Sequence, residues 1–561
     1  MSADPTSQPE LMLPETLQQL EQRLARIEQH LQLPPLAEGS APAFAAAVEV
    51  ETAPAAPATP AATEPSEDEL EFEVGQNWFA SVGVLVLTCG VGFALSLPWS
   101  GLPSVAPAVA GYALAAGLLL IAYFWKKSFE LVAGYFRGAG MALLYFSTLR
   151  LFFFGAPQVL DLEATGGRLL LLAVVGANLT VALRQKSPWL LGLALLTGLI
   201  TAVAVGAPYF VFVSVALLLG IAAYATVRHQ WPDLLLFAIP AGYAAHLLWA
   251  INRPWSGRSG KILAEPAAGI LFLLVYAVIV AAGTLRRRER TGEDPHAVLA
   301  VLLNCGAGYG LFLLQSLKVA PALLAPVHLA ATVVYLGLAV TFWRSEASRI
   351  STFFYAMTGY LALSVAIVKT FPAPELFIWL SGQSLVVVVT ALWFRSRLIV
   401  VANFFIYVSI VLAYMVVAQA ESGISIVLGI VALLTARILN LKKERLELKT
   451  ELMRNAYLAS AFVVFPYAFY HLVPRAYVSL SWVAVAVAYY LMNLIVRNPK
   501  YRWMGHLTLL LTVGYVLIAG LTSLSSTTRI ISFLVLGSVL LVVSLIFTQV
   551  RARRKREGGG K

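Results

Sequence analysis

The chain has 561 residues, of which 59% are hydrophobic and 12% are charged, and its mean hydropathy is +0.78. These values exclude an ordinary soluble protein, whose charged fraction is near one quarter. The formal net charge of +11 would suggest nucleic acid as a partner, but its distribution along the chain, described below, predicts contact with anionic lipids and no nucleic-acid binding.

The first segment, residues 1–33, is predicted to contain one short helix over residues 15–33. Leucine and isoleucine recur there at alternating spacings of three and four, which is a heptad seam, at Leu17, Leu20, Leu24, Ile27 and Leu31. A helix of under three heptads is marginal in water when isolated. We therefore expect a coiled-coil helix that self-associates or binds a protein partner, or that docks in a groove of its own protein, with a frayed helix as a further alternative.

Residues 34–76 are rich in alanine, proline and glutamate and lack apolar periodicity. This composition is typical of a disordered linker. Together, residues 1–76 carry 14 acidic and 2 basic residues, so the basic excess lies in the remainder of the chain.

Residues 77–550 read as a polytopic transmembrane domain. A span needs about 20 apolar residues, and we find about eighteen such stretches in an all-α pattern. The predicted spans are 77–97, 103–125, 131–154, 166–183, 188–206, 208–226, 233–251, 265–284, 297–315, 323–343, 350–369, 374–394, 398–417, 422–438, 455–471, 476–496, 503–520 and 530–550. The fold class is therefore predicted to be a transmembrane helical bundle preceded by a short cytoplasmic coiled-coil helix.

The basic residues predict the orientation of the chain. Residues 551–561 form a basic tail directly after the last span, which marks a cytoplasmic end under the positive-inside rule. Counted back from this tail, the loops assigned to the cytoplasm hold 28 lysines and arginines and the opposite loops hold 8. An even number of spans places both termini in the cytoplasm, where the basic loops would face an anionic leaflet.

Two stretches carry a resemblance to a known family. Residues 75–97 (GQNWFASVGVLVLTCGVGFALSL) and 138–148 (GAGMALLYFST), with the N-terminal coil and linker, resemble a bacterial family of many-span predicted membrane proteins known as a domain of unknown function. The similarity covers roughly residues 70–250. The resemblance implies a bacterial cytoplasmic (inner) membrane location and supplies no catalytic residues.

Polar residues within predicted spans are the first candidates for a substrate path, because ionisable and amide groups are costly to bury there without partners. Arg137 and Arg150 lie in the third span, where snorkelling to the membrane surface is the alternative. Asn178 and Asn304 lie near the middle of the fourth and ninth spans, where hydrogen bonding between helices is the alternative role.

His246 is the histidine that we place at membrane depth, and a proton-coupled carrier would need such a titratable group. The structural alternative is a buried histidine with satisfied hydrogen bonds. Lys369, Glu375 and Gln383 form a further predicted cluster on the outer side, which contains both charge signs.

Motifs for catalysis or cofactor binding are absent from the sequence, so we expect no cofactor and no bound metal. Cys89 and Cys305 both fall within spans, which is typical of small apolar fillers. The glycines of 306–310 (GAGYG) lack the strand and the Lys-Ser/Thr of a nucleotide loop, so close helix packing is the better interpretation.

Three functions stay open at this point. The first is a transporter or permease-like protein for a small or amphipathic envelope-related molecule, suggested by the polar groups and by helix breakers such as Pro107, Gly138 and Pro240. The second is a non-catalytic scaffold that recruits partners through its N-terminal helix. The third is an enzyme acting on lipid-linked substrates through outer-loop residues such as Arg253, Arg258 and Glu375.

Overall fold

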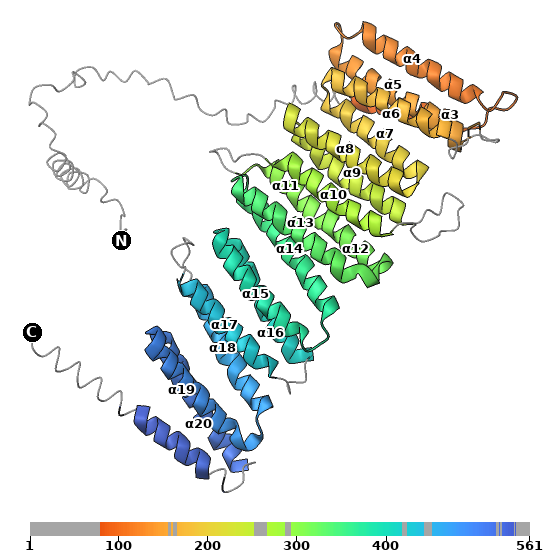
Figure 1. Cartoon of the computed structure of the whole chain (residues 1–561). Helices are drawn as coiled ribbons and strands as arrows, with labels where there is room; N and C mark the ends of the chain where they lie inside the picture. Colours follow the sequence, from red (N-terminus) through yellow and green to blue (C-terminus); the bar gives the residue numbers. More distant parts are fainter. Residues whose placement is uncertain are drawn as a thin grey trace, which may run out of the picture. The chain divides into compact units, whose positions relative to one another are not determined.

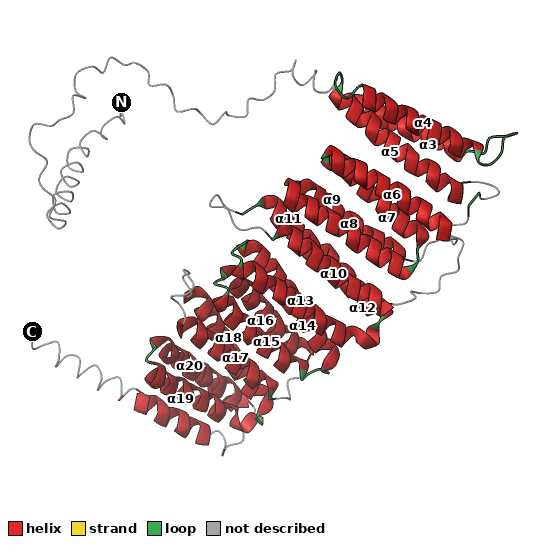
Figure 2. Ribbon diagram, turned by 45° about the horizontal axis from the view of Figure 1, so that its top comes forward, coloured by secondary structure: helices red, strands yellow, loops and turns green. Residues whose placement is uncertain are grey.

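The computed structural model describes residues 79–154, 159–160, 165–251, 266–285, 293–417, 423–441, 451–522, 527, 530–543 and 545. Helices make up nearly all of this described chain, and no strand occurs in it (Figure 2). The chain separates into two units, Met1–Trp78 and Phe79–Lys561. The predicted N-terminal helix at 15–33, the linker at 34–76 and the basic tail at 551–561 all lie outside the described residues.

The elements follow one another along the chain in the order shown in Figure 1. They are α3 (Phe79–Ser96), α4 (Ala106–Phe124), α5 (Glu130–Phe153), α6 (Thr165–Gln185), α7 (Pro188–Val205), α8 (Pro208–His229), α9 (Pro232–Ala250), α10 (Pro266–Thr284), α11 (Pro295–Leu303), η3 (Asn304–Gly308), α12 (Tyr309–Val319), η4 (Pro321–Leu323), α13 (Leu324–Arg344), α14 (Arg349–Thr370), α15 (Leu376–Trp393), α16 (Arg397–Val417), α17 (Ile424–Leu441), α18 (Glu451–Leu472), η6 (Arg475–Tyr477), α19 (Val478–Val496) and α20 (Pro499–Thr522). A further apolar helix spans Ile530–Val543.

Local sequence signals explain where many of these helices begin. Pro188, Pro208 and Pro232 each occupy the first turn of a helix, where the missing N–H has no intrahelical acceptor to lose. Ser187 caps α7 and Asp294 caps α11 by accepting backbone N–H groups with their side chains. The turns between spans are therefore encoded locally.

Thirteen helices of the described chain are long and apolar enough to cross a membrane. This indicates a multi-pass membrane protein. A helix coincides with each of the predicted spans, including the shorter apolar helices Gly83–Ser96 and Ile530–Val543. α5, α18 and α20 also coincide with predicted spans without being among the thirteen, and in α5 the residues Arg137 and Arg150 lower the mean hydropathy. The figure of about eighteen spans stays a prediction.

The helices contact one another in a regular order. Every substantial helix–helix contact in the described chain joins a span to the next span or to the next but one, if α11, η3 and α12 are counted as one span. For example, α8 packs on α9 and α10, and α15 packs on α16 and α17. Such nearest-neighbour contact is the pattern of helical repeat arrays, in which each unit is stabilised by its neighbours in the sequence.

The core between these helices is rich in aromatic side chains with a polar tip. Tyr276, Tyr335, Tyr355, Tyr407 and Tyr457 are among the largest fully buried side chains. A buried tyrosine hydroxyl needs a hydrogen-bond partner, particularly where no water is present. The partners of these hydroxyls locate the most polar part of the core.

Candidate functional site

A π-helical turn interrupts the ninth predicted span. Residues Asn304–Gly308 form this turn, η3, between α11 and α12. A single π-turn inside an α-helix places one residue out of the normal register, and such turns are frequent at functional sites. The residue that begins this turn, Asn304, was a candidate from the sequence.

Asn304 is fully buried and joins its own span to three other helices. Its Nδ2 donates to the Ala277 carbonyl in α10 at 3.0 Å and to the Tyr355 hydroxyl in α14 at 3.1 Å. Its Oδ1 accepts from the Tyr243 hydroxyl in α9 at 2.6 Å. Both ends of the amide are therefore satisfied by protein groups, which is the arrangement that a helix-coupling asparagine requires.

Gly308 makes room for this arrangement. A Cβ atom at position 308 would lie 2.5 Å from the Tyr243 Oη atom, so a larger residue would push the tyrosine away from Asn304. Gly306 and Gly310 differ, because a Cβ at either position would meet nothing within 4 Å. The prediction that this glycine run serves close packing is therefore supported at Gly308 alone.

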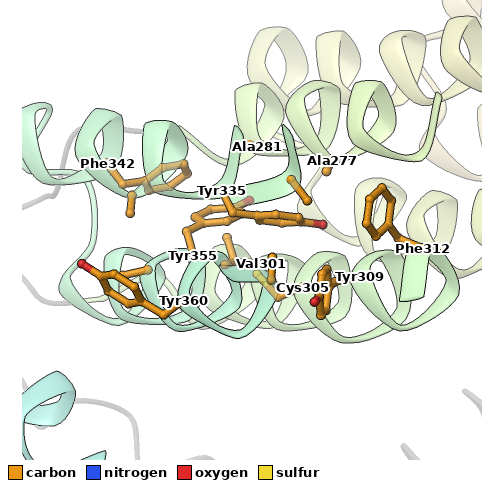
Figure 3. Close-up of a cluster of buried hydrophobic side chains, with 14 of the residues drawn as sticks. Ala277, Ala281, Val301, Cys305, Tyr309, Phe312, Tyr335, Phe342, Tyr355 and Tyr360 are labelled. Atoms are coloured by element: carbon orange, nitrogen blue, oxygen red, sulfur yellow. The ribbon is translucent and has the colours of Figure 1, made fainter. Parts of the chain in front are cut away.

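Aromatic rings enclose the turn on the side of α13 and α14. The rings of Tyr335 and Tyr355 stack with centroids 6.3 Å apart. Figure 3 shows these two rings between α10, which carries Ala277, and the helix that carries Cys305. Cys305 is buried here, as the sequence predicted for an apolar filler.

His246 lies in the same region, on α9, and is fully buried. The Tyr276 hydroxyl donates to the Phe212 carbonyl at 3.1 Å, so its oxygen is left to accept from His246 Nδ1 at 3.4 Å. This assigns the imidazole proton to Nδ1 and leaves Nε2 as an acceptor. The Gln315 side chain is the neighbour that faces this imidazole. Neither His246 Nε2 nor Gln315 Nε2 has a partner at ordinary hydrogen-bond distance.

A second buried histidine, His328, was missed by the sequence analysis, which placed only His246 at depth. Its Nδ1 lies 3.1 Å from the Tyr309 hydroxyl and its Nε2 lies 3.0 Å from Ser316 Oγ. Ser316 donates its own proton to the Leu313 carbonyl, so His328 Nε2–H donates to Ser316 and Nδ1 accepts from Tyr309. Every polar atom of this histidine is satisfied. Its position in the second turn of α13, close to a predicted span end, concealed it.

We use the name polar cluster for Tyr243, His246, Tyr276, Asn304, Tyr309, Gln315, His328 and Tyr355. Each of these side chains is at most 5% exposed. The cluster contains hydroxyl, amide and imidazole groups, which can exchange hydrogen bonds and relay protons. It holds no carboxylate, and no group of three or more His, Cys, Asp or Glu side chains in the described chain is placed to bind a metal.

The other candidates from the sequence do not join this cluster. Asn178 is buried on α6 and donates to the Met141 carbonyl of α5 at 3.3 Å. Gln383 is buried on α15 and donates to the Tyr360 carbonyl of α14 at 2.7 Å and to Ser364 Oγ at 3.0 Å. Each therefore bonds a neighbouring helix at its own location.

Three of the charged candidates occupy accessible positions, while Arg150 is buried. Arg137 is half-buried on α5, while Lys369 and Glu375 are exposed on either side of the turn between α14 and α15, with no ion pair between them. Arg150 is 2% exposed, and its guanidinium donates to the Leu97 carbonyl at 3.2 Å. Arg253 and Arg258 lie outside the described residues.

Asn403 on α16 resembles Asn304 in its contacts and was also missed. Its Nδ2 lies 2.9 Å from Ser384 Oγ in α15 and 3.1 Å from the Tyr457 hydroxyl in α18. Asn403 also lies inside a predicted span, so the criterion that selected Asn178 and Asn304 would have selected it too. The described chain thus uses buried asparagines repeatedly to join neighbouring helices.

Comparison of the chain with protein-family models, with curated proteins and with solved structures finds no match. The resemblance of residues 75–97 and 138–148 to a bacterial membrane family therefore stays an observation on the sequence.

Proposed function

We propose that the chain is a non-catalytic membrane scaffold. In this proposal the helices of residues 77–550 form a stable platform in a bacterial cytoplasmic membrane, with both termini in the cytoplasm. The N-terminal helix, residues 15–33, then recruits a protein partner or a second copy of the chain to the membrane surface. The linker over 34–76 would give this helix reach.

The observation that carries the proposal is the use of the buried amides. Asn178, Asn304 and Gln383 each donate to a backbone carbonyl of a neighbouring helix, and Asn304 and Gln383 also bond hydroxyl groups. A transport path would need such groups to converge on a space open to solvent. Side chains engaged in this way support a structural role, as does the contact of each span with its neighbours in the sequence.

A small-molecule carrier is the second candidate, because one observation favours it. His246 and Asn304, predicted separately, belong to one polar cluster beside a π-helical turn, and His246 Nε2 has no partner there at ordinary hydrogen-bond distance. A carrier would open this cluster to one side of the membrane at a time. Its substrate would meet imidazole, amide and phenol groups and no buried acid within the cluster.

Proximity labelling in native membranes tests the scaffold against the carrier. A biotin ligase is fused to the C-terminus of the full chain, and the labelled proteins are compared with those from a chain in which Leu20, Leu24 and Ile27 are changed to serine. The scaffold predicts that a discrete set of partners, or labelling between copies of the chain, disappears with these changes. The matched control places serines at Gln18, Gln22 and Gln29, off the leucine seam.

The same chains are then assayed for complementation of a deletion strain. The scaffold predicts that the triple serine variant loses function while Asn178→Leu retains it. Retained function and unchanged labelling in the triple serine variant would contradict the proposal. Loss of function in a stable His246→Phe variant, with an intact N-terminal helix, would favour the carrier instead.

A further inference from the structure

An apolar groove runs along the membrane face formed by α6, α8 and α10. Its volume is about 480 Å³, and its lining comes from those three helices alone. These are alternate spans; α8 packs directly on α10, and α6 contributes the lining residue Leu183. Successive spans run in opposite directions, and the three helices therefore share a direction.

The groove has the shape and chemistry of a site for one hydrocarbon chain. Along α8 it extends from Val213 to Tyr224, which is about 16 Å at the rise of an α-helix. Gly220 has no side chain and therefore leaves the groove open at this position, where a Cβ atom would meet nothing within 4 Å. Leu217 and Tyr224 on its rim are exposed by 63% each, as expected of lipid-facing side chains.

Two arginines lie beyond one end of the groove. Leu183, Tyr224 and Ile279 all line it within the last two turns of their helices, so it ends where α6, α8 and α10 end. Arg184 directly follows Leu183, and Arg228 lies one turn beyond Tyr224. Both arginines are exposed. Arginines at this depth can bind a phosphate that lies at the membrane surface.

A second groove provides an internal comparison. It is lined by α7 and α9, has a volume of about 440 Å³, and includes Asp233. The Asp233 side chain is 86% exposed. The two grooves have similar volumes, and a carboxylate lines the second groove but not the first. Asp233 Oδ1 lies 3.5 Å from His296 Nε2, and an anionic headgroup is still expected to favour the first groove.

We propose that the α6–α8–α10 groove is a binding site for an anionic phospholipid. One acyl chain lies along α8 from Val213 toward Tyr224, and the phosphate is held by Arg184 and Arg228. This inference does not depend on the scaffold function, because it concerns the lipid-facing surface of the platform alone.

Native mass spectrometry of the full chain tests the site with two lipids of identical acyl chains, phosphatidylglycerol and phosphatidylcholine. We expect tighter binding of phosphatidylglycerol, and a roughly tenfold or greater loss of that binding in the double variant Arg184→Gln/Arg228→Gln, at about 1 kcal/mol for each arginine. Gly220→Leu, which fills the groove, should release both lipids. Gly176→Leu is the matched control, because position 176 on α6 is equally open and lies outside the groove.

A diazirine-bearing phosphatidylglycerol provides a second measurement that does not depend on variants. Its photoadducts should map to α8 between Val213 and Tyr224 and should vanish in Gly220→Leu, with the unfolding temperature of the variant unchanged. The proposal is overturned if the two lipids bind equally, if the double arginine variant binds phosphatidylglycerol as the unaltered chain does, or if the adducts map to the groove beside Asp233.

Discussion

The Tyr243 hydroxyl and the Asn304 side-chain oxygen are 2.6 Å apart, although the two residues are separated by 61 positions in the sequence. The bond joins α9 to the π-helical turn of the next span but one. Because Asn304 also bonds α10 and α14, a single buried amide couples its own span to α9, α10 and α14. The polar cluster can therefore hold the packing of the array in register.

Replacing Asn304 by leucine should destabilise the membrane domain. The change leaves the hydroxyls of Tyr243 and Tyr355 without their partner inside an apolar core, and we expect a loss of about 2–3 kcal/mol in unfolding free energy. Asn178→Leu, which removes one 3.3 Å bond, should cost about 0.5 kcal/mol. Reversible unfolding in mixed detergent micelles measures both. Equal losses in the two variants would contradict the coupling role of Asn304.

Gly308→Ala should lower the unfolding free energy of the membrane domain, whereas Gly306→Ala should leave it nearly unchanged. A methyl group at position 308 would overlap the Tyr243 phenol, and overpacking of this kind costs about 1–3 kcal/mol. At position 306 the methyl group would face open space, so we expect a change within about 0.5 kcal/mol. Thermal unfolding of the two alanine variants, prepared side by side, makes the comparison. Two variants with indistinguishable unfolding temperatures would show that Tyr243 is not held against this turn.

The combined change His246→Phe/Gln315→Leu should leave the membrane domain at least as stable as the unaltered chain. The two side chains face each other, and each carries a buried nitrogen with no partner at ordinary hydrogen-bond distance. Replacing both groups together by apolar ones of similar size is neutral or favourable. A phenyl ring at 246 would keep the stacking on Phe212. Urea or SDS unfolding provides the measurement. A loss above about 2 kcal/mol would mean that the two nitrogens do have partners in the membrane.

The membrane orientation can be tested with reporter fusions. Alkaline phosphatase and green fluorescent protein are fused in turn after Lys127, Arg290 and Lys561, each of which lies in a segment that we assign to the cytoplasm. Fluorescence without phosphatase activity is expected at all three sites. Phosphatase activity at any one of them would show that the span series is miscounted before that point.

Hydropathy predicted the helices well because a span is a local property of about twenty residues. Each predicted range coincides with a helix, and Pro188, Pro208 and Pro232 mark the starts of three of them. The predicted spans also separated Asn178, His246 and Asn304 from the exposed loops, and all three are buried.

The partners of those residues could not be predicted in the same way. Tyr243 and Tyr355 are two of 22 tyrosines, and only the packing of α9 and α14 on the turn selects them for Asn304. The π-helical turn could not be predicted either, because the glycines in it are also typical of close packing between ordinary α-helices. His328 was missed because distance from a span end is a poor measure of burial when neighbouring helices cover that end.

The accessibility of Cys305 tests the central claim, that the polar cluster is a closed coupling element of the platform. The chain has two cysteines, so Cys89→Ser leaves Cys305, which adjoins Asn304, as the single thiol. The folded protein is treated in membranes with a charged, water-soluble thiol reagent from each side, with Glu375→Cys in the same background as the exposed control. We predict that Glu375→Cys is modified rapidly while Cys305 reacts only after unfolding. Modification of Cys305 in the folded protein from either side would reveal a water-filled path through the cluster and contradict the account.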